Sequence, residues 1–173
     1  MRRIVTCSAF VMALVLASSA GVGSAQKSNQ VYLDKDFLVH TFTNSHAEVR
    51  ISELADKHSN NQKVKDFAQK VIKDHKDMND KLSKMASDQK IAVVAGTDQA
   101  TKDTYDRLSK LNGAEFDREY LKTMVSNHET LVQMLETQSK QGKDANLTDF
   151  AKTALPGAQQ HLKDARALAA QVK

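Results

Sequence analysis

Three histidines and one glutamate stand at positions where this chain otherwise places apolar residues. His75, His128 and His161 each fall on the apolar face of a separate predicted helix, and Glu48 takes a comparable place on a fourth. A buried imidazole or carboxylate must be hydrogen-bonded, kept neutral or bound to a metal, because an unpaired polar group in a protein core is costly. The four residues therefore predict either a metal site or a buried polar network.

The types of the available ligands indicate a transition metal without selecting one. Three imidazoles and one carboxylate suit a single ion of zinc, copper, nickel or iron. The only cysteine is Cys7, so the chain after it offers neither thiolate ligands nor a disulfide. Met78 and Met124 lie one turn from two of the histidines, and a thioether would favour copper, but core packing explains these methionines better.

The alternative is a metal-free network that sets the register of the helices. In that case each histidine donates a hydrogen bond to a neighbouring helix, and Glu48 or Asp74 accepts one. Asp74 and Glu129 directly precede or follow a candidate histidine, so they point about 100° away on the helix and lie outside the primary site. Both interpretations remain open.

Four long helices are needed to carry these residues, and the apolar periodicity predicts them. No tryptophan, a single proline and an aromatic content of 5% are typical of a helical protein. Apolar residues recur at steps of three and four in segments 34–58, 62–90, 114–141 and 144–172. Pro156 removes a backbone donor, so it should kink the last helix or restart it.

The connections between these helices indicate their topology. Ser59, Asn60 and Asn61 form a tight turn, and Gly142 follows the third helix, so two antiparallel hairpins are expected. Residues 91–113 break the periodicity and leave room for a short helix over 98–111. We predict an all-α, ferritin-like antiparallel four-helix bundle, in one domain over 34–173, with a long crossover that contains a short helix.

The four polar residues occupy similar levels in such a bundle. Glu48 lies 12 residues before the turn near residue 60, and His75 lies 15 after it. His128 lies 15 residues before the turn near residue 143, and His161 lies 18 after it. Each pair differs by three residues, or about 4.5 Å along the axis. We therefore expect all four side chains to meet near the middle of the bundle.

The N-terminus has the pattern of a secretory signal peptide over residues 1–25. Arg2 and Arg3 precede an apolar run, and small residues at 23–25 offer a cleavage site. Residues 26–33 are expected to be a disordered segment before the helical domain. The pattern predicts export, to the periplasm or the cell envelope.

The charge of the chain is nearly balanced. The formal net charge is +4, and it falls to +2 without the two arginines of the leader. Lysines alternate with acidic residues along the helices, which is typical of solvated faces and not of a nucleic-acid groove. We expect no nucleic-acid partner, whereas association with the envelope remains open and the oligomeric state is unknown.

Several short motifs together resemble a known protein family. They are Ala47-Glu48-Val49, Asp74-His75, Gly113-Ala114-Glu115-Phe116-Asp117, Met124-Val125 with His128, and Leu155-Pro156 with His161. Over residues 36–172 the chain resembles small exported bacterial proteins described as a domain of unknown function, often called predicted outer-membrane proteins and placed in the ferritin-like superfamily. The resemblance implies a ferritin-like bundle and no established reaction.

A di-iron centre is not expected in spite of this resemblance. Ferritin-like di-iron proteins carry Glu-x-x-His on two helices, whereas the residues three before the histidines are Ile72, Val125 and Ala158. No catalytic triad and no phosphate-binding loop is recognisable, so an enzyme is the less favoured interpretation. The leading hypothesis is an exported bundle that binds one transition-metal ion. The alternative is a structural or stress-associated module of the envelope with a buried His/Glu network.

Overall fold

The computed structural model describes residues 34–95 and 98–172, and this part of the chain contains helices and no strand. The predicted signal peptide (1–25) and the predicted disordered segment (26–33) lie outside the described residues. The helices are α1 (Asp34–Ser52), α2 (Ala55–His58), α3 (Gln62–Asp88), α4 (Gln99–Leu108), α5 (Gly113–Gln141) and α6 (Ala145–Ala169). None of these helices has the length and apolar character needed to cross a membrane.

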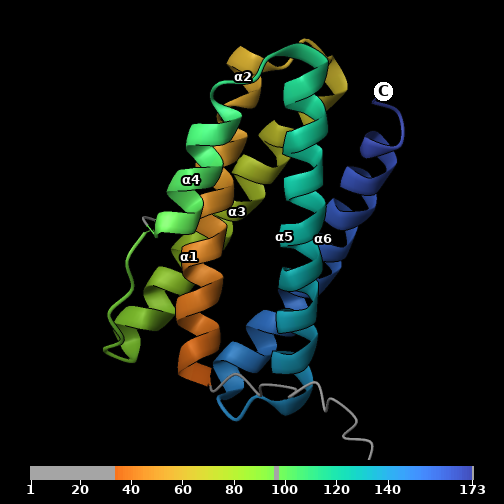
Figure 1. The fold of residues 1–173 in the computed structure, drawn as a ribbon. Helices are drawn as coiled ribbons and strands as arrows, with labels where there is room; N and C mark the ends of the chain where they lie inside the picture. Colours follow the sequence, from red (N-terminus) through yellow and green to blue (C-terminus); the bar gives the residue numbers. More distant parts are fainter. Residues whose placement is uncertain (1–33, 96–97, 173) are drawn as a thin grey trace, which may run out of the picture. The chain divides into compact units, whose positions relative to one another are not determined.

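The four long helices form two antiparallel hairpins that pack against each other (Figure 1). Helix α1 pairs with α3 and α5 pairs with α6, while α1 also contacts α5 and α3 contacts α6. The chain passes from the first hairpin to the second through a crossover that contains α4. The predicted all-α four-helix bundle with a long crossover is confirmed, and its connectivity is that of ferritin-like folds with one crossover.

One predicted helix boundary is wrong, and one of the two alternatives predicted for Pro156 is excluded. The first helix is not continuous to residue 58, because the Leu54 N–H donates to the Ile51 carbonyl (3.2 Å) and tightens the chain between α1 and α2. The last helix does not restart at Pro156, because α6 runs through it. Pro156 is exposed, so water can hydrogen-bond the carbonyl that the ring leaves unpaired.

The first residue of α1 fastens the two hairpins together at one end of the bundle. The Asp34 carboxylate accepts hydrogen bonds from Gln138 Nε2 (2.6 Å) and from the backbone N–H groups of Lys143 (3.1 Å) and Asp144 (2.8 Å). Partial burial acts to raise the pKa of Asp34, but these hydrogen bonds outweigh it and lower the pKa. The contact links the start of α1 to the turn between α5 and α6.

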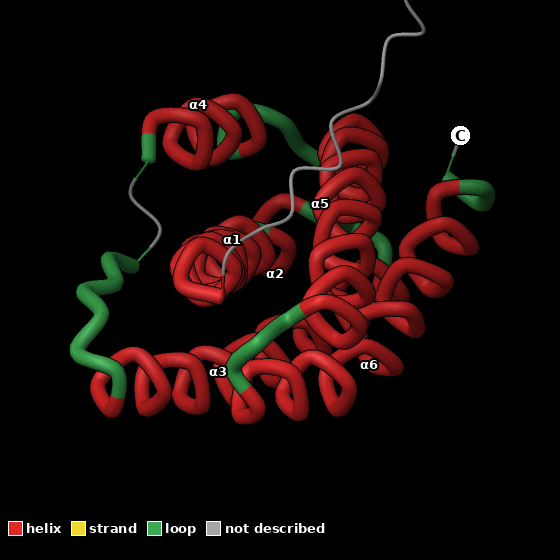
Figure 2. The backbone as a smooth tube through the Cα atoms, turned by 90° about the horizontal axis from the view of Figure 1, so that it is seen from below, coloured by secondary structure: helices red, strands yellow, loops and turns green. Residues whose placement is uncertain are grey.

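The crossover covers one flank of the bundle. Asp98 caps α4 by accepting from the Thr101 N–H (2.7 Å), and Leu108 at the other end of α4 is fully buried. Gly113, with a φ of +56°, then starts α5 in a conformation that glycine adopts without strain. Helix α4 lies outside α1 and contacts α1 and α5 (Figure 2), and no described segment covers α3 and α6 in this way.

A polar layer, formed by Glu48, His75, His128 and His161, divides the apolar core into two clusters. On α5, Met124 belongs to one cluster and Leu131 to the other, and His128 lies between them. On α1, α3 and α6 as well, one of the other three candidate residues lies between side chains of the two clusters. The apolar side chains on both sides therefore hold the four helices at the spacing that brings this layer together.

Candidate metal centre

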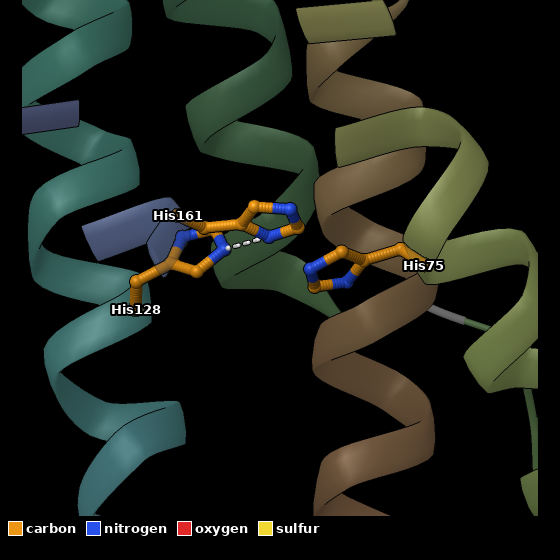
Figure 3. Close-up of side chains that lie close together, drawn as sticks. All are labelled: His75, His128 and His161. Atoms are coloured by element: carbon orange, nitrogen blue, oxygen red, sulfur yellow. Dashed lines mark hydrogen bonds between the residues drawn. The ribbon is translucent and has the colours of Figure 1, made fainter. Parts of the chain in front are cut away.

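The structure brings the four predicted site residues together, one from each long helix. Glu48, His75, His128 and His161 are all buried, with 2%, 1%, 0% and 2% of their surface exposed. Each of the three histidines offers a ring nitrogen, and these nitrogens lie within 4.8 Å of one another (Figure 3). Glu48 lies beside this group, with its Oε2 at 3.2 Å from His75 Nε2 and 3.5 Å from His128 Nε2.

The tautomer of His128 follows from the turn of its own helix. Its Nδ1 lies 3.0 Å from the carbonyl oxygen of Met124. A carbonyl only accepts, so Nδ1 carries the proton and donates, and the neutral ring has its lone pair on Nε2. This nitrogen lies 3.2 Å from His161 Nδ1, the contact drawn in Figure 3.

His161 also makes a hydrogen bond with its outer nitrogen, Nε2, the ring nitrogen that does not face His128. His161 Nε2 lies 3.0 Å from Oδ2 of Asp74, a half-exposed carboxylate on α3 that accepts a hydrogen bond from Nε2–H. The neutral His161 ring then has its lone pair on Nδ1. Two lone pairs thus face each other between His128 and His161, and a hydrogen bond between them needs one further proton.

Burial opposes that further proton. Desolvation, followed by the neighbouring His161 ring, lowers the pKa of His128 from 6.5 to about 4. Desolvation and the charge of Lys70 also lower the pKa of His161, although Asp74 acts against them. At neutral pH both rings are therefore uncharged, and their facing nitrogens remain electron-pair donors.

His75 of α3 is oriented by Ser45 of α1, the other long helix of the same hairpin. The Ser45 hydroxyl donates to the backbone carbonyl of His75 (3.3 Å), so it can accept from Nδ1–H of the same residue (3.0 Å). That arrangement leaves the lone pair of His75 on Nε2, which is buried and makes no hydrogen bond with any described residue. The third imidazole therefore also presents a free lone pair to the layer.

Glu48 and His75 do not form an ordinary ion pair. Glu48 Oε2 and His75 Nε2 lie 3.2 Å apart, yet within residues 34–95 and 98–172 neither atom makes a hydrogen bond. Burial raises the pKa of Glu48 from 4.5 to about 8, although a hydrogen bond from Asn127 acts to lower it. Burial and the two neighbouring histidines hold the pKa of His75 well below 6.5. In the metal-free protein both groups are therefore uncharged near neutral pH.

The donor and acceptor inventory of the layer shows what it lacks. Three imidazole lone pairs face one another, and the proton of a neutral Glu48 is the one hydrogen-bond donor that these four side chains can offer them. A single cation would accept all three lone pairs after the rings move closer together, because nitrogens up to 4.8 Å apart exceed the span of two Zn–N bonds of about 2.0 to 2.1 Å. Three imidazoles are an established ligand set for zinc, and imidazole also suits copper, nickel and iron.

Three further residues support the site. Asp74 was expected as an acceptor in the metal-free network, whereas Ser45 and Asn127 were not predicted. Ser45 lies three residues before Glu48 on α1, a spacing that places both on one helix face and was available in the sequence. Asn127 directly precedes His128 but bonds Glu48 on α1. Asp74 directly precedes His75 but bonds His161 on α6. Only the packing of the helices shows these two contacts.

Met78 and Met124, the two methionines considered as thioether ligands, pack in the apolar core. Met124 is fully buried in one apolar cluster, and its sulfur accepts from the Ser52 hydroxyl at 3.9 Å. Met78 packs against the other cluster. These contacts agree with the interpretation that the methionines fill the core.

The fold and the buried layer define a four-helix bundle with three histidines at its centre. The chain belongs to the family described as Domain of unknown function (DUF4142), whose model matches residues 17–168. This description names no ligand, no reaction and no ferritin-like relationship.

One solved structure extends the comparison of the fold. The crystal structure of a candidate secreted protein, DUF305, from Streptomyces coelicolor has a TM-score of 0.68 and 12% sequence identity, covering 82% of this chain and 93% of that chain. At this identity the likeness shows the fold alone. No curated protein is significantly similar to the sequence.

The stability of the metal-free protein should depend on pH in two opposite ways. The histidine pKa values are depressed in the fold, so stability rises with pH up to about 6.5, where the unfolded histidines lose their protons. The pKa of Glu48 is raised to about 8, so its contribution is full below 4.5 and declines as pH rises to about 8. Chemical denaturation of chelator-treated protein should show maximal stability near pH 6.5, then a loss on the order of 1 to 2 kcal/mol by pH 8.

The matched control for this profile is Glu48→Gln. This variant keeps the depressed histidines, so it should retain the rise on the acid side and lose the decline above pH 6.5. An equal decline in Glu48→Gln would show that another group causes it.

Proposed function

We propose that this protein binds one transition-metal ion in the polar layer, through His75 Nε2, His128 Nε2 and His161 Nδ1. The observation that carries the proposal is the set of three inward lone pairs, each fixed by a hydrogen bond on the outer nitrogen of the same ring. Histidine ligands of metals characteristically have this second contact, which fixes the tautomer and orients the ring.

Glu48 is the fourth candidate ligand. Its Oε2 lies close to two of the proposed ligand nitrogens and makes no hydrogen bond. A bound cation reverses the local electrostatics, because a positive charge favours the ionised carboxylate that burial otherwise disfavours. Glu48 would then compensate one charge of a divalent ion within the apolar core.

The alternative is a metal-free bundle in which neutral Glu48 donates to one histidine and the layer fixes helix register. The hydrogen bonds of Ser45, Met124 and Asp74 support this alternative, because they orient the rings without a metal. It leaves two of the three inward lone pairs without a partner. Such a protein would act as a structural or interaction module of the envelope.

Metal titration distinguishes the two functions. Purified wild-type protein should bind one equivalent of zinc, copper, nickel or iron and melt at higher temperature, because the ligand binds only the folded state. With free metal at about 100 times Kd the gain is roughly 2.7 kcal/mol, or about 5 to 10 °C for a domain of this size. Calorimetry with metal analysis gives the stoichiometry, and thermal denaturation gives the gain.

A double variant and a surface variant provide the controls. The combined change His75→Ala and His128→Ala should abolish the metal-dependent gain, whereas His40→Ala, at an exposed histidine of α1, should keep it. Absence of a gain in wild type, or an equal gain in the double variant, would leave the metal-free network as the function of the layer.

Asp74 should affect metal affinity without touching the ion. It accepts from His161 Nε2–H, so Asp74→Ala should weaken metal binding by about 10- to 100-fold while the one-to-one stoichiometry remains. Asp77→Ala, at an exposed carboxylate one turn further on α3, is the matched control for the change in surface charge. Equal losses in the two variants would assign the effect to charge and not to the orientation of His161.

We also propose that the protein is exported to the periplasm or the cell envelope. The pattern of residues 1–25 supports this proposal, as does the likeness to a candidate secreted protein. Fractionation of producing cells should recover a chain that begins near Gln26 outside the cytoplasm, as measured by intact mass. Recovery of the full-length chain from the cytoplasm would contradict export.

A further inference from the structure

A cleft of about 640 Å³ lies between α3 and α6, on the flank that α4 does not cover. Its apolar walls include Met78 and Met85 of α3, Leu131 of α5, and Phe150, Ala154 and Ala158 of α6. The volume falls within the range of about 300 to 1,000 Å³ that is typical of small-molecule sites. The cleft is thus large enough to hold a small organic molecule.

The cleft exists because α6 presents small side chains to α3. Ala154, Gly157 and Ala158 line it on that side, and a Cβ placed on Gly157 would meet no atom within 4 Å. The long side chains of α3 opposite them, such as Met78 and Met85, do not fill the remaining space. Gly157 is an exposed lining residue of the cleft, so a large side chain placed there has room to occupy part of the space at the edge of the cleft.

The inner end of the cleft reaches the polar layer. His75 and His161 are lining residues of the cleft, and so is Asp74, the carboxylate that orients His161. An external ligand at the ion would either take the position of Glu48, which leaves three protein ligands as in catalytic zinc sites, or add a fifth ligand beside it. An external ligand that enters through the cleft meets two of the three histidines.

The charges around the cleft restrict the class of this ligand. Its charged lining residues are Asp74, Asp77, Asp88, Asp149, Lys81 and Lys84. Acidic groups outnumber basic ones, and Lys84 already pairs with Asp88 at 2.8 Å, so the lining offers no excess of positive charge to attract an anionic ligand. The apolar walls favour an uncharged body, and the ion favours a nitrogen or sulfur donor.

We propose that the α3–α6 cleft binds a small, uncharged, largely apolar molecule with one nitrogen or sulfur donor, which coordinates the metal ion of the histidine layer. This inference rests on the proposed metal site. It adds that the site is open to exchangeable ligands from one side, whereas a purely structural metal site would have all its positions filled by the protein.

The test compares 4-phenylimidazole with imidazole on protein loaded with one equivalent of Co(II), whose visible absorption reports a change of ligands. Both molecules carry the same donor, but only 4-phenylimidazole has an apolar ring for the cleft. It should bind wild type at least tenfold more tightly than imidazole. Gly157→Leu should remove this preference and change the affinity for imidazole less than twofold, because the leucine occupies the space of the ring and not the ion.

Gly157→Ala is the matched control, because its single methyl group has open space at that position and should keep the preference for 4-phenylimidazole. Thermal denaturation of each Co(II)-loaded variant verifies that it is folded. Equal affinities of the two molecules for wild type, or an unchanged preference in folded Gly157→Leu, would overturn the cleft as a binding site while the metal site stands. Failure of wild type to bind Co(II), zinc, copper, nickel or iron would overturn both proposals.

Discussion

Three imidazole lone pairs directed at one another in a buried layer are the constraint that dominates this structure. His128 and His161 donate from their outer nitrogens to a carbonyl and a carboxylate, and His75 donates to the Ser45 hydroxyl when that hydroxyl donates to the His75 carbonyl. In this arrangement each neutral ring only accepts on its inner side. An uncompensated group of this kind costs free energy in a core. The cost is removed by something positive at the centre, a shared proton or a metal ion, and a metal ion satisfies all three nitrogens.

The apolar clusters on either side of the layer give it its rigidity. They pack the four long helices above and below the histidines, so the rings cannot turn outward to water without opening the bundle. The same packing keeps the layer at low dielectric, where Glu48 and the histidines lose their charges. Burial therefore produces both the preorganised ligands and the neutral state in which nitrogen lone pairs are available to a metal.

The bundle is also asymmetric in a way that bears on function. The crossover places α4 over the α1–α5 flank, while small residues of α6 leave a cleft against α3. Two histidines of the buried layer consequently line a cleft on the α3–α6 flank. The fold shared with the Streptomyces coelicolor protein does not by itself determine a function, because function depends on the site that a fold carries.

The sequence by itself determined the helices, the two hairpins and the level of four polar residues, because apolar periodicity and short turns are local properties of the chain. It placed Glu48, His75, His128 and His161 within a turn of one another. The direction of each ring nitrogen, the contact of Asp74 with His161 and the α3–α6 cleft were decided only by the tertiary structure. They depend on which acceptors and how much side-chain volume a neighbouring helix supplies. The sequence offered Asp74 as an acceptor, but only the packing of the helices shows that it bonds His161, 87 positions away.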